Sequence, residues 1–226
     1  MKMQNKTVKD MYQKYVKYYG NEHIFDIFEN KRLYASPYQN LNDCAEGDFY
    51  ILGKISGTET HALMDDIKNE KSARYICCFS KGEKNYDNDR KGSVKFNPLM
   101  WAHYADGGKG IMINFHTVNS ACVREVKYVN SYPYYDYKMS IPDNADFILT
   151  HKINDWKYEN EYRILTDSQY VDIEIKSVVA GFRFNKKSGT NCMPDTRIAA
   201  EYKWFKSYLK EKKIALFSFE EYYGTV

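Results

Sequence analysis

The sequence predicts an α+β domain in which flanking helices cover a mixed or antiparallel sheet. Segments with strand character gather in the second half of the chain, whereas helix patterns are mostly early, which is typical of this class. The chain has no internal repeat, low-complexity tract or linker that would divide it. We therefore expect one domain over residues 1–226, with a core at about 14–184 and a C-terminal helix and strand at 193–219.

Helical spacing and capping residues define the early elements. An amphipathic pattern predicts a helix over 7–19, with its last residues 16–19 open to an extended form. Asn21 is a capping residue for a second helix that ends at Asn30, with Phe25 among its inward-facing residues. The remaining early elements are a strand at 31–36, a helix at 58–71 and a strand at 73–80.

A long polar loop at 81–96 separates these elements from the later ones. Asn97 and Pro98 predict a helix start, because proline suits the first helical position, and Gly107-Gly108 ends that helix. An aromatic-rich loop follows the strand at 123–129. The other later elements are strands at 110–115, 159–166, 171–175, 177–184 and 214–219, and helices at 143–152 and 201–212.

Composition narrows the class of protein. Hydrophobic residues at 43% and charged residues at 28% describe a globular chain, and a formal charge of +3 is too small for a dedicated nucleic-acid-binding protein. Five cysteines without regular spacing fit a reducing cytoplasm and disfavour zinc. No run has the length of a membrane span or the apolar core of a signal peptide. We expect a cytoplasmic protein without a metal or a membrane partner.

Tyrosine is the unusual feature, with 22 residues, and aromatic residues reach 16% of the chain. Aromatic surface can stack on a nucleobase or on a nicotinamide ring. The alternative is that an AT-rich gene encodes many Tyr, Lys, Asn and Ile residues. Composition favours this second explanation.

The stretch 152–165 carries the most suggestive charges. On a strand, Glu159, Glu161 and Arg163 would share one face, because side chains two apart point the same way. Two carboxylates at that spacing reach one sugar-sized ligand, and Arg163 can hold one of them ionised. The alternative is a solvated face with a charge ladder, and this stretch alone favours it.

Other polar and aromatic clusters have an ordinary explanation and a functional one. Asn42 and Asp43 suit a turn, Ser80 suits a strand end, and His103 and Tyr104 suit packing with a hydrogen-bonded imidazole. The functional explanation predicts that the separated motifs converge on a single pocket, bordered by Tyr34, Asn42, Ser80, His103 and Glu161. No HExxH, GxGxxG, GxSxG or P-loop motif occurs, which disfavours a hydride-transfer enzyme, a serine hydrolase or a kinase.

The motifs together resemble a large bacterial domain-of-unknown-function family, whose hallmarks are a MWAHYA-like block and a W-x-x-E-x-E-Y-R block. The resemblance covers about 14–184. The segments that carry it are Lys17-Tyr18-Tyr19, Leu33-Tyr34-Ala35-Ser36-Pro37, Leu41-Asn42-Asp43, Cys78-Phe79-Ser80, Met100-Trp101-Ala102-His103-Tyr104-Ala105 with Lys109-Gly110, and Trp156-Lys157-Tyr158-Glu159-Asn160-Glu161-Tyr162-Arg163.

Glu159-x-Glu161 on a strand is also distantly similar to the signature of ADP-ribosyltransferases. That resemblance implies their fold, NAD as substrate, and a nucleic acid or protein as acceptor. Glu161 would stabilise the oxocarbenium-like transition state, and Glu159 would lie on the acceptor side. It also implies a toxin or an anti-phage effector. The residues implied to bind NAD are Lys17 and Tyr18, in place of a first-strand Arg or His, with Tyr34, Ser36, Asn42, Asp43, Ser80, Trp101, His103, Tyr104 and Arg163.

Two alternatives remain open at the level of sequence. A non-catalytic module could use the same fold to hold a nucleotide or a nucleic acid in an aromatic cleft. A phosphodiester-cleaving enzyme could use Asp43, Glu46, His103 and Lys109, although their spacing does not require a metal cluster.

Overall fold

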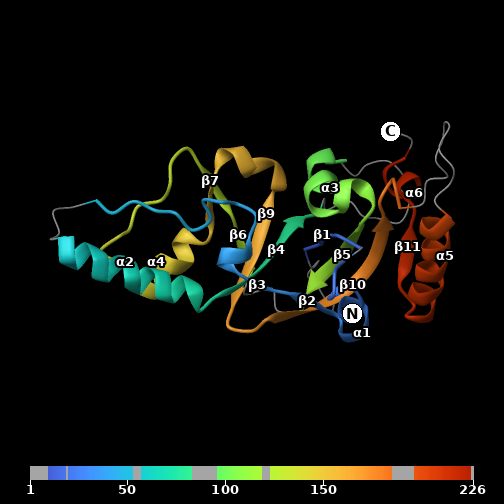
Figure 1. Ribbon diagram of the computed structural model, residues 1–226, viewed down its shortest axis with the longest axis horizontal. Coiled ribbons are helices and arrows are strands. Elements are labelled where there is room, and N and C mark those ends of the chain that lie inside the picture. The colour runs from blue at the N-terminus through green and yellow to red at the C-terminus, as the bar shows by residue number, and fades with distance from the viewer. Residues whose placement is uncertain are drawn as a thin grey trace, which may run out of the picture. The chain divides into compact units, whose positions relative to one another are not determined.

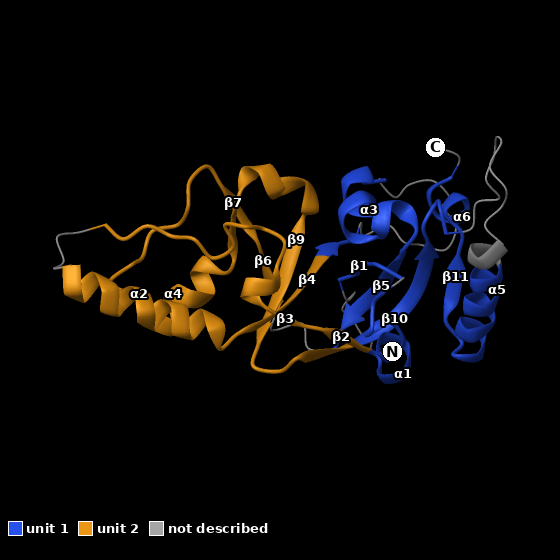
Figure 2. Ribbon diagram, in the orientation of Figure 1, with its two compact units in different colours: residues 1–31, 80–118, 173–226 blue, residues 32–79, 119–172 orange. Residues whose placement is uncertain are grey.

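A computed structural model describes residues 10–18, 20–52, 57–82, 96–118, 123–184 and 196–224. Its elements confirm an α+β chain with a mostly antiparallel sheet and flanking helices (Figure 1). The chain forms two compact units, each assembled from separate stretches (Figure 2). Unit 1 comprises the described residues of 1–31, 80–118 and 173–226, and unit 2 those of 32–79 and 119–172. Within the described residues, no helix is long and apolar enough to cross a membrane.

Unit 1 is built on antiparallel strands. β5 (Ile111–Thr117) pairs on one side with β1 (Tyr12–Val16) and on the other with β10 (Tyr170–Ala180), and β11 (Ala215–Phe217) pairs with β10 in parallel. Its helices are α1 (Ile24–Asn30), α3 (Pro98–Tyr104), the short 3-10 helix η2 (Asp106–Gly108), α5 (Thr196–Glu211) and α6 (Phe219–Tyr223).

Unit 2 places helices beside short strands. α2 (Gly57–Ser72) packs on α4 (Ile141–Ile148), and β9 (Glu161–Thr166) pairs antiparallel with β6 (Val123–Glu125). Its other elements are β2 (Arg32–Tyr34), β3 (Ser36–Pro37), η1 (Tyr38–Asn40), β4 (Tyr75–Lys81, which continues into unit 1), β7 (Lys127–Val129), β8 (His151–Ile153) and η4 (Asn154–Glu159).

Local signals placed several elements correctly. The side chain of Asn97 accepts a hydrogen bond from the backbone N–H of Met100 and Pro98 opens α3, as predicted. The helix predicted at 58–71 is α2, and the strand predicted at 73–80 is β4. The strands predicted at 171–175 and 177–184 are one strand, β10, with an irregularity in its pairing between Ile175 and Ser177. The loop predicted at 81–96 falls largely outside the described residues.

The helix predicted at 7–19 is wrong where the structure describes it, because residues 12–16 form β1. This strand has partners on both sides, and four of its five residues are buried. Apolar residues on both faces of a central strand do not alternate with polar ones, so the pattern imitates a helix. A second correction concerns Phe25, which is 41% exposed and packs edge-on against Trp204 of α5 instead of turning inward.

Candidate functional site

The predicted strand at 159–166 begins later than expected. Glu161 opens β9, whereas Glu159 ends the 3-10 helix η4, and Asn160 between them has a left-handed backbone with φ of 45°. Asparagine tolerates this conformation better than most residues. The expected strand geometry for Glu159 is therefore wrong. The turn nevertheless directs both carboxylates to the same lysine.

Five charged side chains form what we call the charged cluster: Glu46, Lys152, Glu159, Glu161 and Arg163. The ammonium of Lys152 lies 2.7 Å from Glu159 Oε2 and 3.1 Å from Glu161 Oε2. The guanidinium of Arg163 donates to Glu161 Oε1 at 2.8 Å and to both oxygens of Glu46 at 2.6 and 2.8 Å. It also donates to the carbonyl of Leu149 at 2.5 Å.

Burial separates this cluster from a surface charge ladder. The side chains of Lys152, Glu159, Glu161 and Arg163 are at most 5% exposed, and that of Glu46 is 3% exposed. The solvated-face alternative is therefore wrong. Arg163 holds one of the two carboxylates, that of Glu161, and Lys152 links Glu159 to the same network.

The neighbours of Glu161 and Lys152 hold these two groups in their charged forms. Burial would raise the pKa of Glu161, but Arg163 and Lys152 outweigh it and hold that pKa well below the usual carboxyl range. Burial would lower the pKa of Lys152, but Glu161 and Glu159 outweigh it and raise the pKa. Three acidic side chains thus contact two basic ones, and each is at most 5% exposed.

The same contacts limit what Glu161 can do. One of its oxygens accepts from Arg163, and the other accepts from both Lys152 and Arg163. Its backbone N–H donates to the hydroxyl of Tyr128 at 2.8 Å. Contact with a ribose hydroxyl would therefore require the exchange of at least one of these ion pairs.

Residues predicted to bind NAD are divided between the units. In unit 2, Tyr34 is half-buried with its ring edge-on to Tyr170, Ser36 is half-buried in β3, and Asn42 is exposed. Asp43 is buried and accepts from the N–H of Ala45 at 3.0 Å, which confirms the turn explanation for it.

In unit 1, two aromatic residues predicted to bind NAD are core residues. Trp101 is 0% exposed, and its indole N–H donates to the hydroxyl of Tyr223 at 3.2 Å. Tyr18 is 4% exposed and packs on Phe184 and Phe205. Neither ring presents a face on which a nucleotide could stack, so the role in binding NAD that the resemblance implies for Trp101 is wrong.

The remaining predicted residues of unit 1 differ in exposure: Lys17 and His103 are exposed, Tyr104 is half-buried, and Ser80 is buried in β4. The five residues predicted to border a single pocket therefore belong to different units. Ser80 and His103 are in unit 1, and Tyr34, Asn42 and Glu161 are in unit 2. None of these five residues lines the pocket described next.

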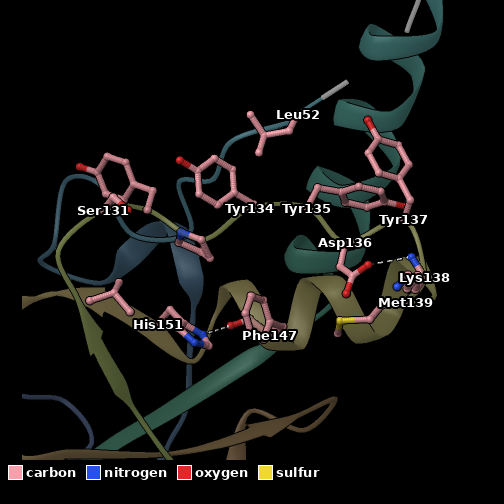
Figure 3. A pocket seen from close by; sticks show the side chains of 13 residues that line it. Leu52, Ser131, Tyr134, Tyr135, Asp136, Tyr137, Lys138, Met139, Phe147 and His151 are labelled. Atoms are coloured by element: carbon pink, nitrogen blue, oxygen red, sulfur yellow. Dashed lines mark hydrogen bonds between the residues drawn. The ribbon is translucent and has the colours of Figure 1, made fainter. Parts of the chain in front are cut away.

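Unit 2 contains an open pocket of about 640 Å³ in the aromatic-rich segment after β7 (Figure 3). We call it the tyrosine pocket. Figure 3 shows Tyr134 between Leu52 on one side and Phe147 and His151 on the other, with Tyr135 and Tyr137 to the right. It is lined by Leu52, Val129, Ser131, Tyr132, Pro133, Tyr134, Tyr135, Asp136, Tyr137, Lys138, Met139, Phe147 and His151.

Backbone and side-chain hydrogen bonds fix the wall of this pocket. Tyr50 pairs with the segment through its N–H to the carbonyl of Pro133 at 2.9 Å, and its carbonyl accepts from the N–H of Tyr135 at 2.8 Å. Asn144 of α4 is wholly buried and makes the second anchor. Its amide donates to three carbonyls, those of Asp136, Met139 and Ser140, and accepts from the N–H of Asp136.

Sequence reasoning noted this segment as aromatic but assigned no site to it. The available signal was the run of four tyrosines between residues 132 and 137, next to a helix that starts at a Ser140 cap. The ring of Tyr50, from a distant part of the sequence, lies 5.5 Å from that of Tyr134 and 5.9 Å from that of Tyr132. This partner could not be read from the segment itself.

Among the described residues, no group of three or more His, Cys, Asp or Glu side chains could hold a metal ion. Comparison of the chain with protein-family models, with curated proteins and with solved structures gave no match. The resemblances noted from the motifs therefore remain predictions.

Proposed function

We propose that this chain is a nucleotide-binding module and that the tyrosine pocket holds the base. The observation that carries the proposal is a pocket of about 640 Å³ whose walls are mostly apolar and include four tyrosines and Phe147. Small-molecule sites usually measure about 300–1,000 Å³ and combine apolar walls with a few polar groups. The polar groups here include the Ser131 and tyrosine hydroxyls, Asp136, Lys138 and His151.

Exposed ring faces support this use of the pocket. Tyr134 and Tyr137 are 46% and 54% exposed although both are large aromatic residues. A base stacked on such a ring gains about 1–3 kcal/mol, and stacking tolerates different bases. Both rings are therefore accessible to a base, whereas Trp101 is enclosed in the core of unit 1.

Equilibrium binding of AMP, NAD and a short single-stranded oligonucleotide tests the proposal. Tyr134→Ala and Tyr137→Ala should each weaken binding about fivefold or more, which corresponds to the loss of about 1 kcal/mol of stacking. Trp204→Ala is the matched control, because Trp204 is also an exposed aromatic residue, 51% exposed, but belongs to unit 1. The proposal fails if none of the three ligands binds, or if the control weakens binding as much as the pocket variants do.

A second candidate is an NAD-dependent ADP-ribosyltransferase or NAD glycohydrolase with an ADP-ribosyltransferase-like fold. The charged cluster favours it, because buried ion pairs rarely add stability over apolar packing and strongly shifted ionisable groups concentrate at functional sites. In this reaction the ionised Glu161 would stabilise positive charge on the ribose, and Glu159 would serve an acceptor that is a nucleic acid or a protein. The resemblance would make such an enzyme a toxin or an anti-phage effector. Release of nicotinamide from NAD by the pure protein tests it.

A further inference from the structure

The carboxylate and the ammonium group that line the tyrosine pocket balance each other. Asp136 and Lys138 are two positions apart in the wall, and both residues are exposed to solvent. Net charge therefore does not decide which base the pocket accepts. Stacking on the tyrosines does not decide it either, because every base has a π-face. Selection among bases must then come from hydrogen bonds to the edge of the base.

His151 of β8 is a lining residue whose hydrogen-bonding role is fixed by its contacts. Its Nδ1 lies 2.6 Å from the carbonyl oxygen of Phe147 (Figure 3). A carbonyl oxygen can only accept, so Nδ1 carries the proton and donates. The imidazole also packs on the ring of Phe147, with centroids 4.1 Å apart. These two contacts hold the imidazole in one orientation and, when it is neutral, in one tautomer.

The other ring nitrogen of His151, Nε2, is consequently an acceptor in the neutral imidazole. Within the described ranges of the chain, Nε2 makes no hydrogen bond to another residue, so it is the ring nitrogen available to a ligand. Asp136 adds a second acceptor, because its Oδ1 accepts from the N–H of Lys138 at 2.8 Å and a carboxylate can accept several hydrogen bonds. Tyrosine hydroxyls rotate and can do either. The polar groups that are held in position at this pocket therefore accept.

We propose that the tyrosine pocket selects a nucleobase with an exocyclic amino group, such as adenine or cytosine, and that Nε2 of His151 accepts from this group. The inference rests on the proposed function, because the base is the one that stacks on the tyrosines, and it adds the group by which the base is recognised. An amino group donates two hydrogen bonds, whereas a base edge without it leaves the acceptor of His151 unpaired. AMP and NAD both contain adenine and so meet this requirement.

Nucleotide pairs that differ only in the amino group test the selection. AMP is compared with purine riboside monophosphate, and CMP with pyrimidin-2-one riboside monophosphate, in which hydrogen replaces the amino group. Calorimetric titration of the full chain at pH 8, which favours the neutral imidazole, should give the amino form of at least one pair an affinity about fivefold higher or more. The pair that shows the preference identifies the base.

An AMP whose amino nitrogen carries two methyl groups is the control for size. It is larger than AMP but has no N–H to donate at this position, so it should bind as weakly as purine riboside monophosphate if adenine is the base. An affinity equal to that of AMP would contradict recognition through a donated hydrogen bond.

Two substitutions of His151 examine the acceptor. In His151→Asn the side-chain amide can replace Nδ1 as the donor to Phe147, but no atom replaces Nε2, so the preference for the amino form should fall to about twofold or less. In His151→Gln the longer side chain can bring an amide oxygen toward the position of Nε2, so part of the preference should remain. His116→Asn is the matched control, because Nδ1 of His116 likewise lies 2.9 Å from a backbone carbonyl, that of Asp10, but in unit 1.

The outcomes separate this inference from the proposed function. If nucleotides bind but neither pair shows a preference, the inference is wrong and the nucleotide-binding module stands. The same conclusion follows if His151→Asn weakens both members of a pair equally, because an unchanged ratio indicates a structural role for His151. If no nucleotide binds, both proposals are wrong. Loss of the preference in His151→Asn and its full retention in His116→Asn support the inference.

Discussion

The two units differ in what their interiors are made of. Unit 1 has an aromatic core in which Trp101 and Phe205 are 0% exposed, and its buried polar groups are neutral amides and hydroxyls such as Gln13, Asn114 and Ser177. Unit 2 instead buries the charged cluster and leaves tyrosines exposed around a pocket. Neutral hydrogen bonds are suited to stability, whereas buried charges and exposed rings lower it. The contrast supports the proposal that the function lies in unit 2.

The largest expected effect comes from removing one member of the charged cluster. Arg163→Met leaves Glu46 and part of Glu161 without their cation in a buried site, which typically costs about 3–5 kcal/mol. Urea unfolding measures the loss, and hydrogen exchange of the segments 111–117 and 150–166 assigns it to a unit. Arg74→Met is the control, because Arg74 pairs with Asp146 at a partly exposed site, where about 0–1 kcal/mol is expected. Equal loss of protection in both segments would break the comparison between the units.

Acid should weaken unit 2 by less than that substitution, because a protonated Glu161 still accepts hydrogen bonds. Its folded pKa is lower than its unfolded value, so its contribution to stability is complete above the unfolded pKa of about 4.3. The contribution is lost as the pH falls below that value toward the folded pKa. The measurement is exchange protection of 150–166 at pH 7 and pH 3. Glu161→Gln should show a smaller difference between the two pH values, and an unchanged difference would contradict the assignment.

Glu161→Gln also tests the enzymatic candidate. If Glu161 stabilises the transition state, the variant should release nicotinamide from NAD on the order of 100-fold more slowly or worse. Glu159→Gln should instead reduce transfer to an acceptor more than hydrolysis of NAD. Circular dichroism confirms that each variant is folded at the assay temperature. Activity retained in Glu161→Gln would show that this residue takes no part in the mechanism. If the wild-type chain has no activity, the nucleotide-binding module is the proposal that remains.

The smallest effect is expected in unit 1. Tyr223→Phe removes the hydroxyl that accepts from the Trp101 indole N–H, so a buried donor loses its partner at a cost of about 1–3 kcal/mol. Urea unfolding measures this loss, with exchange of 111–117 to locate it. A change in ligand binding by this variant would show that the core of unit 1 takes part in function after all.

Elements with local signals were predictable from sequence. Asn97 and Pro98 fixed the start of α3 because capping and proline geometry act within one turn. β1 was not, because its strand identity depends on partners at 80–81 and 111–115 that lie far away in sequence. Propensity within five residues cannot report such pairing.

The candidate site was predictable in the same uneven way. The spacing of Glu159, Glu161 and Arg163 correctly indicated a shared network, although a turn and Lys152 create it instead of a strand face. Glu46 contacts Arg163 from 117 positions away in sequence, and no local pattern around Glu46 predicts this contact. The tyrosine pocket was missed because composition offered a genomic explanation for tyrosine, and because its walls need Leu52 and Phe147 from other segments.

Asn144 has a consequence for how the pocket forms. The buried side-chain amide of Asn144 joins α4 to the segment 136–140 by hydrogen bonds. The conformation of this segment therefore depends on the folded helix. Folding of α4 and assembly of the pocket wall should therefore be a single cooperative event. Ligand binding to the pocket then reports the stability of the helix. A ligand bound in the tyrosine pocket, which Phe147 of α4 lines, would raise the free energy needed to unwind α4 in proportion to the logarithm of its concentration.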